Sequence, residues 1–422
     1  MKRLKQYLYS PSSLSLADQA IVSGGNFLVT ILLARWLSTG EFGSFAVIWL
    51  ILMFASAIQQ ALVVAPMMTL FSKSESPQAF ISNSLVQIVL YIAIVATFVW
   101  ITLHFFGSFF WATNYTSVPV HALPLLFTGF LIYDFSRKLL LVRQWYLKAI
   151  IMDGLALLVV LSGVSALYIS GFFNLQNFVV LYSFTQLSLA IGFLFQHNFT
   201  GISAKSLKDQ ILQHWQYSRW LVVTSVLQLF AGNFYIITAA ALLGPVAMAA
   251  IKVVQNIMGL INVLFLAMEN YVPVKAAHIF NNEGKQKLFQ YLKNNTWQQA
   301  IPLVLILSVI LLGAESILQL IYGQEFMQYA NILRLFAGLY LVNYIGIPFR
   351  FAIRTLHMNG WILIAYAVSV VSSLAFAHYF ISWWGLAGVA IGMIISQLTL
   401  NFTLMSSFLP KIKLKWISYT WS

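Results

Sequence analysis

The chain has 422 residues, of which 60% are hydrophobic, 16% aromatic and 8% charged, and it contains no cysteine. A soluble domain carries about 25% charged residues, so this composition excludes a soluble enzyme, a disordered chain and a nucleic-acid binder, even at a net charge of +13. We expect a membrane protein with no disulfide framework, no thiolate metal site, no other metal site and no cofactor.

Twelve apolar segments follow one another along the chain. A spanning helix needs about 20 mostly apolar residues, and a closed barrel would show short alternating runs instead. The predicted fold class is therefore an all-α polytopic membrane protein. The predicted spans cover 14–37, 42–70, 80–105, 118–141, 147–169, 174–196, 215–242, 246–271, 297–320, 329–353, 360–380 and 385–408.

A longer break after the sixth span divides the chain into two halves. We predict an N-terminal six-helix lobe over 1–200, a cytoplasmic connecting loop over 201–214 and a C-terminal six-helix lobe over 215–422. The longest loops are expected near 197–214 and 272–296. Because each half has an even number of spans, both halves enter the membrane from the same side, and any internal repeat is parallel.

Basic residues gather on one side of the predicted topology. With the N-terminus in the cytoplasm, most Lys and Arg residues fall at the two termini and in the even-numbered loops, while the opposite loops are uncharged or acidic. The positive-inside rule then predicts that both termini are cytoplasmic. This asymmetry explains the net charge without a nucleic-acid partner.

The first predicted span carries a polar stripe. Gln19, Ser23, Asn26 and Thr30 recur at steps of four, three and four residues, which places them on one helix face. Gln228 lies on a similar face of the seventh span. Polar side chains in lipid face the bundle or a wet cavity, so the stripe indicates either helix–helix contact or the lining of a cavity.

The eighth predicted span has a longer stripe. Lys252, Gln255, Asn262 and Glu269 follow at steps of three, seven and seven residues, within an arc of about 100°, and Asn256 borders it. The stripe extends over roughly 25 Å at the helical rise. It favours a wet path over a purely structural polar seam, although both interpretations stay open.

Three cations lie outside the predicted cytoplasmic set: Arg35, Lys252 and Arg334. Arg35 and Arg334 can snorkel to the outer interface, whereas Lys252 lies further inside its span. If the three converge, they form an electropositive pocket with few carboxylates nearby, which suits phosphate or diphosphate.

The acids inside the predicted spans all lie near cytoplasmic ends: Asp18, Asp134, Asp153 and Glu269. Asp134 is one turn from Arg137 and Lys138, so we expect a salt bridge there. Asp18 and Glu269 are candidates for ion or proton coupling, although capping and pairing with basic loops explain them equally well.

Four parts of the sequence together resemble one family. They are the opening stretch (Ala17–Ala20, Ser23–Phe27, Leu33–Leu37 and Glu41–Gly43), then Leu242–Lys252, Ile332–Leu335 and Trp384–Gly392. In this order, they resemble the polysaccharide transporters, which are the O-antigen and exopolysaccharide flippases of the multidrug/oligosaccharidyl-lipid/polysaccharide exporter superfamily.

The resemblance implies two six-helix lobes around a central cavity that opens alternately to each side of a bacterial or archaeal cytoplasmic membrane. Spans one, two, seven and eight would line the cavity. The implied substrate is a polyprenyl-diphosphate-linked glycan, moved to the outer leaflet. Arg35, Lys252 and Arg334 stand at positions typical of the family for holding the diphosphate. The implied partners are membrane lipids and other polysaccharide assembly proteins.

Three other interpretations compete with a glycan flippase. A multidrug exporter of the same superfamily is the nearest, although cationic drugs call for carboxylates in the cavity. A membrane-embedded glycan polymerase or ligase would need a sizeable outer loop, and the outer loops here are short and nearly uncharged. A scaffold without transport activity would leave the polar stripes without a purpose. We therefore expect a transporter and no enzymatic activity.

Overall fold

A computed structural model describes residues 11–111, 119–197 and 199–408, and all regular secondary structure in these ranges is helical. The chain divides into two compact units, Met1–Val226 (unit 1) and Leu227–Ser422 (unit 2), which are described separately. The predicted all-α class is confirmed. Most of these helices are long and apolar enough to cross a membrane.

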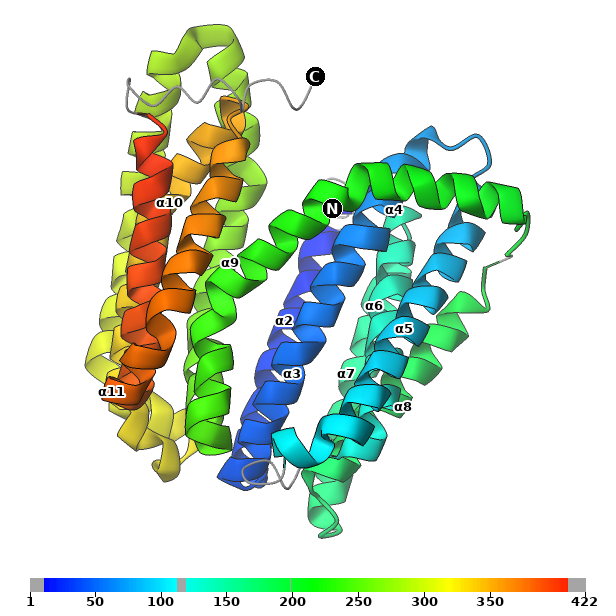
Figure 1. Ribbon diagram of the computed structural model, residues 1–422, viewed down its shortest axis with the longest axis horizontal. Coiled ribbons are helices and arrows are strands. Elements are labelled where there is room, and N and C mark those ends of the chain that lie inside the picture. Colours follow the sequence, from blue (N-terminus) through cyan, green and yellow to red (C-terminus); the bar gives the residue numbers. More distant parts are fainter. Residues whose placement is uncertain (1–10, 112–118, 198, 409–422) are drawn as a thin grey trace, which may run out of the picture. The chain divides into compact units, whose positions relative to one another are not determined.

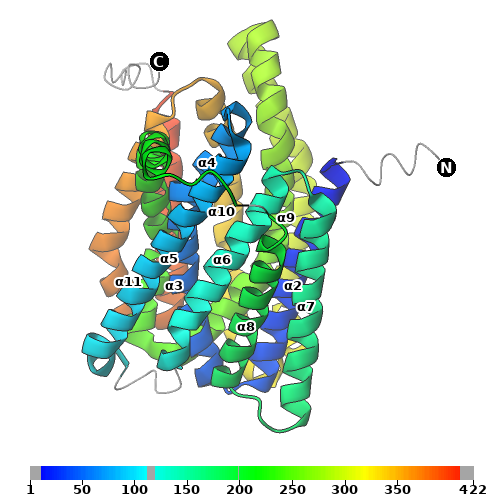
Figure 2. The same ribbon diagram turned by 90° about the vertical axis from the view of Figure 1, so that its right-hand side faces the viewer.

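Unit 1 contains six long helical segments that run side by side (Figures 1 and 2). They are α2 (Pro11–Trp36), α3 (Thr39–Gln59) with its continuation, α5 (Pro77–Trp111), α6 (Leu123–Val142), α7 (Tyr146–Ile169) and α8 (Leu175–Leu194). A π-helical turn (Gln60–Val64), α4 (Ala65–Leu70) and a short 3-10 turn (Phe71–Lys73) continue α3, and another 3-10 turn (Val120–Ala122) precedes α6.

One carboxylate organises the starts of two of these helices. Glu41 and Ser38 form a capping box at the start of α3, where the Ser38 hydroxyl accepts from the Glu41 backbone N–H. The second oxygen of Glu41 accepts a hydrogen bond from the Leu175 backbone N–H at 3.1 Å. Asn174 caps the same end of α8. Helix starts that are far apart in sequence are thereby tied together.

Unit 2 contains the other six long segments, because glycines break its two longest helices. Gly244 and Gly284, at φ 76° and 81°, divide α9 (Ala204–Tyr322), and Gly385, at φ 55°, divides α11 (Gly360–Ser406). Only glycine adopts this backbone readily. With α10 (Ala330–Thr355), which follows a 3-10 turn (Gln324–Tyr329), the described residues of unit 2 also form six long helical segments, the first of which begins in unit 1.

The segments expected to be the longest loops are mostly helical. Helix α9 begins at Ala204, inside the predicted connecting loop 201–214, and the region 272–296 is helical except for the break at Gly284. That break forms the tip of a helical hairpin that extends beyond the ends of α10 and α11 in unit 2 (Figure 1). The two units divide at Val226, within α9. The charged residues of these two regions therefore belong to amphipathic helices and do not mark loops.

The first part of α9, residues 204–226, runs crosswise over one end of unit 1 (Figures 1 and 2). Its Gln210 and His214 are buried, and the Gln210 amide donates to the Phe80 carbonyl of α5 at 3.0 Å and to the Ser84 hydroxyl at 2.9 Å. The amide of Asn83 donates to Ser206 at 2.8 Å. These bonds join the crosswise helix to α5.

Helices α6 and α8 pack at very short range. A Cβ atom on Gly129 would lie 2.7 Å from the Ser183 carbonyl oxygen, which belongs to the backbone and cannot move aside cheaply. Small residues at such crossings let helices in a membrane approach closely. Gly154 of α7, by contrast, has open space at the corresponding position.

We expect Gly129→Ala to lower the free energy of unfolding by about 1–3 kcal/mol, the usual cost of overpacking. Gly154→Ala is the matched control, and it should be neutral or stabilise slightly because alanine is the better helix former. Thermal or denaturant unfolding of the two variants in detergent compares them directly. Equal stability of the two variants would contradict the close α6–α8 contact.

Candidate functional site

A buried group of charged side chains joins three helices of unit 1. Arg137 of α6 donates through Nε to Asp153 of α7 at 2.6 Å, and its terminal nitrogen pairs with Asp18 of α2. The Tyr133 hydroxyl donates to the other oxygen of Asp153 at 2.5 Å. All four residues are at most 9% exposed. We call Asp18, Tyr133, Arg137 and Asp153 the arginine cluster.

Among the described residues, Asp134 forms the predicted salt bridge with neither Arg137 nor Lys138. Arg137 reaches across to Asp18 and Asp153 on neighbouring helices, and Asp134 instead accepts a hydrogen bond from the Gln59 amide of α3 at 3.2 Å. Gln59 is fully buried and also donates to the Leu131 carbonyl at 3.1 Å. A guanidinium has several donors on a long stem, so it can bridge helices instead of bonding along its own.

The arginine cluster has more acidic than basic groups. With both carboxylates ionised, one guanidinium leaves one negative charge uncompensated. One oxygen of Asp18 is buried and has no hydrogen-bond partner among the described residues, which is costly for a charged group. The arrangement can therefore accept one proton or one small cation at Asp18. Within the described ranges, no group of three or more His, Asp or Glu side chains is placed to hold a metal ion.

The polar stripe of the first span divides between two environments. Gln19, Ser23 and Asn26 are exposed on unit 1, and the Gln19 amide donates to the Ser23 hydroxyl at 3.0 Å. Thr30 is buried and donates to the Asn26 carbonyl at 2.7 Å. Arg35 is exposed in the last turn of α2, where a cation complements the helix dipole.

The polar stripe on α9 lies in unit 2, and the burial of its residues also changes along the helix. Lys252, Gln255 and Asn256 are half-buried, and the Asn256 amide donates to the Tyr322 hydroxyl at 2.6 Å. Asn262 and Glu269 are exposed. Gln228, at the start of unit 2, is exposed as well. The part around Lys252 is thus embedded in packed helix, and the part beyond it is open.

The immediate neighbours of Lys252 in the chain are apolar and fully packed. Ile251 is 1% exposed, and Val253 and Val254 are 0% exposed. Lys252 itself is half-buried, and partial loss of water costs an ammonium group free energy unless polar groups or an anion compensate it.

Arg334 has a different environment from the one expected. Its guanidinium donates to Glu315 at 3.0 Å, to Asn331 at 2.8 Å and to the Leu311 carbonyl at 3.2 Å. Glu315 therefore offsets the charge of this cation, while the convergence of Arg334 with Arg35 and Lys252 stays a prediction. Glu269 lies 4.0 Å from Arg354, and both side chains are 47% exposed.

Sequence reasoning found Asp18 but missed its partners. Asp153 and Arg137 were present as charged residues near the same membrane side, and Tyr133 and Gln59 gave no signal at all. The sequence did give one signal, which was depth in the membrane. Acids and a base that lie at the same depth on different spans can form ion pairs. Which of them face one another depends on helix rotation, and the spacing along the chain does not give that rotation.

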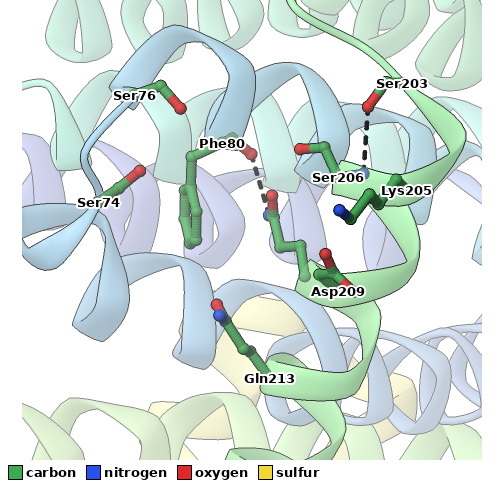
Figure 3. Close-up of a pocket in the computed structure, with 9 residues that line it drawn as sticks. Ser74, Ser76, Phe80, Ser203, Lys205, Ser206, Asp209 and Gln213 are labelled. Carbon is green, nitrogen blue, oxygen red and sulfur yellow. Dashed lines mark hydrogen bonds between the residues drawn. The ribbon is translucent and has the colours of Figure 1, made fainter.

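A polar pocket of about 350 Å³ lies where the crosswise part of α9 meets the turn between α4 and α5 (Figure 3). Two hydrogen bonds join residues that line it: Ser203 accepts from the Ser206 backbone N–H at 3.1 Å, and the Gln210 amide donates to the Phe80 carbonyl at 3.0 Å. Lys205 and Asp209 also line it. The pocket is best explained as the hydrogen-bonded seam that holds α9 in place.

Solved structures share this fold at low sequence identity. The lipid II flippase MurJ in an inward closed conformation has a TM-score of 0.70 and 13% identity, over 93% of this chain and 87% of that one. An inward-facing multidrug resistance MATE family transporter of the MOP superfamily has a TM-score of 0.65 and 16% identity, over 93% and 92% of the two chains.

A MOP superfamily transporter from Pyrococcus furiosus, described by the reverse polarity of its binding pocket, has a TM-score of 0.54 and 16% identity, over 93% of this chain and 90% of that one. No family model matches the sequence, and no curated protein matches it. The likeness establishes a fold of twelve helices in two six-helix lobes.

We expect Arg137→Gln to lower the free energy of unfolding by about 3–5 kcal/mol, because it leaves two buried carboxylates without their cation. Adding Asp153→Asn should restore part of the loss. The control is Arg354→Gln, whose exposed pair with Glu269 is worth at most about 1 kcal/mol. Unfolding in detergent measures all three, and a loss for Arg137→Gln as small as that of the control would contradict the cluster.

Proposed function

We propose that this protein is a membrane transporter that moves a polyprenyl-diphosphate-linked oligosaccharide from the cytoplasmic to the outer leaflet by alternating access. The oligosaccharide would be an O-antigen, capsule or exopolysaccharide repeat unit. The observation that carries the proposal is Lys252, a half-buried cation on a polar face of α9 in unit 2. The shared fold with a lipid II flippase and the sequence resemblance to polysaccharide transporters support it.

Moving a diphosphate across a membrane explains why the protein needs a cation at this position. A diphosphate cannot cross hydrocarbon unaided, because burying unpaired charge is prohibitively costly. The polyprenyl tail has no reason to leave the bilayer. The protein needs only a polar, electropositive groove that opens to one side at a time, and an ammonium group in a site of low polarity binds phosphate oxygens strongly.

The other polar candidates take supporting roles in this proposal. Arg35 is the second cation for the diphosphate, and Arg334 is a weaker third because it is shared with Glu315. Exposed and half-buried amides and hydroxyls can hydrogen-bond sugar hydroxyls without adding charge. These residues are Gln19, Ser23, Asn26, Gln228, Gln255, Asn256 and Asn262. Thr30 is buried and would support the stripe through its bond to the Asn26 carbonyl.

In this proposal, a proton or cation gradient drives transport, and the coupling ion binds at Asp18. The arginine cluster has the spare negative charge for it, and Asp18 has a buried oxygen without a partner among the described residues. Glu269 is the weaker candidate, because it is half-exposed and has Arg354 within 4.0 Å. An exposed carboxylate with a nearby cation gains little from binding another one.

A multidrug exporter is the second candidate, and the specific observation in its favour is the carboxylate excess of the arginine cluster. MATE transporters with this fold are described as multidrug resistance proteins. Cationic drugs would be attracted by carboxylates and repelled by Lys252. Loss of the protein would therefore affect cells differently if it is a flippase than if it is a multidrug exporter.

The test is made in a strain that lacks its own flippase and depends on this chain. We expect lipid-linked repeat units to accumulate facing the cytoplasm without the chain, and export to return with it. Lys252→Gln should reduce export about tenfold or more, the contribution of one charge-assisted bond. Lys287→Gln, which removes an exposed charge, is the control. Normal surface glycan with altered resistance to toxic cations would establish the drug exporter instead.

Asp18→Asn tests the coupling. It removes the ionisable group while keeping its shape, so transport into vesicles should lose its dependence on a proton or sodium gradient while the chain still binds substrate. Glu269→Gln serves as the comparison and should keep the dependence. Retained gradient dependence in Asp18→Asn, with normal stability in detergent, would remove Asp18 from the coupling mechanism.

A further inference from the structure

Unit 1 contains a second pocket, with a different lining. It has a volume of about 350 Å³ and lies between the start of α5 and the turn that joins α6 to α7. Its wall is mostly apolar and contains one guanidinium group. The lining residues are Phe71, Pro77, Gln78, Val142, Arg143, Gln144 and Trp145.

The turn between α6 and α7 holds Arg143 in this pocket. The backbone N–H groups of Gln144 and Trp145 donate to the Leu141 and Leu140 carbonyls at 3.0 and 2.9 Å, and Gln144 has φ 60°, a conformation that costs free energy for a residue other than glycine. Arg143 follows the last residue of α6. The tight turn therefore fixes the Arg143 backbone at the pocket, which its side chain lines.

Arg143 brings an unused donor to the pocket. Its Nε is buried and has no hydrogen-bond partner among the described residues. A guanidinium has only donors, and leaving one buried and unpaired is costly. Burial lowers the pKa of Arg143 from its usual value, as expected for a cation that has lost part of its water.

The surroundings of the pocket are positive. Lys148 lies 4.0 Å above the Trp145 ring, and the Arg143 guanidinium lies 5.3 Å from the same ring. His197 stacks on the same Trp145 ring, with the ring centroids 5.0 Å apart. Burial, then Arg143 and Lys148, lowers the pKa of His197 to about 4, so it is neutral at pH 7. No carboxylate is found among the described lining residues.

The place of the pocket indicates the kind of anion. It lies at the ends of spanning helices, the level at which lipid headgroups meet the acyl chains. Apolar side chains stand out nearby, with Phe195 84% and Leu147 49% exposed. A free phosphate ion would gain nothing from an apolar wall, whereas a lipid phosphate brings acyl chains to cover it.

We propose that this pocket binds the phosphate group of an anionic membrane lipid, with Arg143 as the main donor. Trp145 supplies an aromatic wall and Gln78 an amide. Lys148 adds positive charge from over the Trp145 ring, where it also donates to Gln196 at 2.9 Å. The excess of basic residues at this end of unit 1 fits the anionic lipids of a cytoplasmic leaflet. Binding here does not depend on what the protein transports.

The experiment uses the full chain in detergent with either phosphatidylglycerol or phosphatidylcholine added, and native mass spectrometry counts the lipids retained. We expect the wild-type protein to retain more phosphatidylglycerol than phosphatidylcholine. Arg143→Gln should lose one retained lipid and weaken phosphatidylglycerol binding about tenfold, the contribution of one charge-assisted hydrogen bond. Lys208→Gln is the matched control, because it removes one exposed positive charge from the crosswise helix, and it should bind as wild type does.

Gln78→Glu keeps the proposal testable if Arg143→Gln does not fold. Gln78 is exposed, so the change is tolerated, and a carboxylate at the rim should repel the lipid phosphate as strongly as loss of Arg143. Unchanged lipid retention in both variants would overturn the site. Displacement of phosphatidylglycerol by inorganic phosphate at equal concentration would overturn the lipid assignment, because the pocket would then recognise phosphate alone.

Discussion

The structure of unit 1 depends on a single guanidinium held between two carboxylates from different helices. Arg137 fixes the depth and rotation of α6 against α2 through Asp18 and against α7 through Asp153, and Gln59 extends the network to α3 through Asp134. In a medium of low polarity none of these groups can be left alone. A slide of any helix by one turn would separate charges that have no water to replace the lost bonds.

The helices were predictable because lipid imposes a length and an apolar composition that can be read residue by residue. The tight turns at Gly244 and Gly385 were also marked in the sequence, since few other residues adopt their backbone. Hydropathy fails where a helix lies outside the hydrocarbon. Residues 204–214 carry charges and amides, yet they form a helix whose polar face hydrogen-bonds to α5.

The candidate site was predictable in its residue types and depths and not in its partners. Asp18 was identified as a functional candidate, but its pairing with Arg137 depends on which way two helices are rotated. Arg334 shows the same limit, because its partner Glu315 lies 19 positions away along the chain on a different helix. Long, flexible cations choose among several acceptors within reach, and that choice is made by the packed structure.

Helix α2 links the two kinds of polar group that the proposed transport needs. Asp18 faces inward to the arginine cluster, and the adjacent Gln19, with Ser23, lies on the exposed face of the same helix. A proton or cation at Asp18 changes the bonds that hold α2 to Arg137, and a helix moves as a rigid body over such short distances. Near the midpoint of α2, a Cβ on Gly24 would meet open space, whereas a Cβ on Gly25 would lie 2.9 Å from the Leu157 side chain of α7. In the proposed transport, a binding event at the buried carboxylate would therefore move the exposed polar stripe together with the helix itself, with no separate chain of side-chain contacts required.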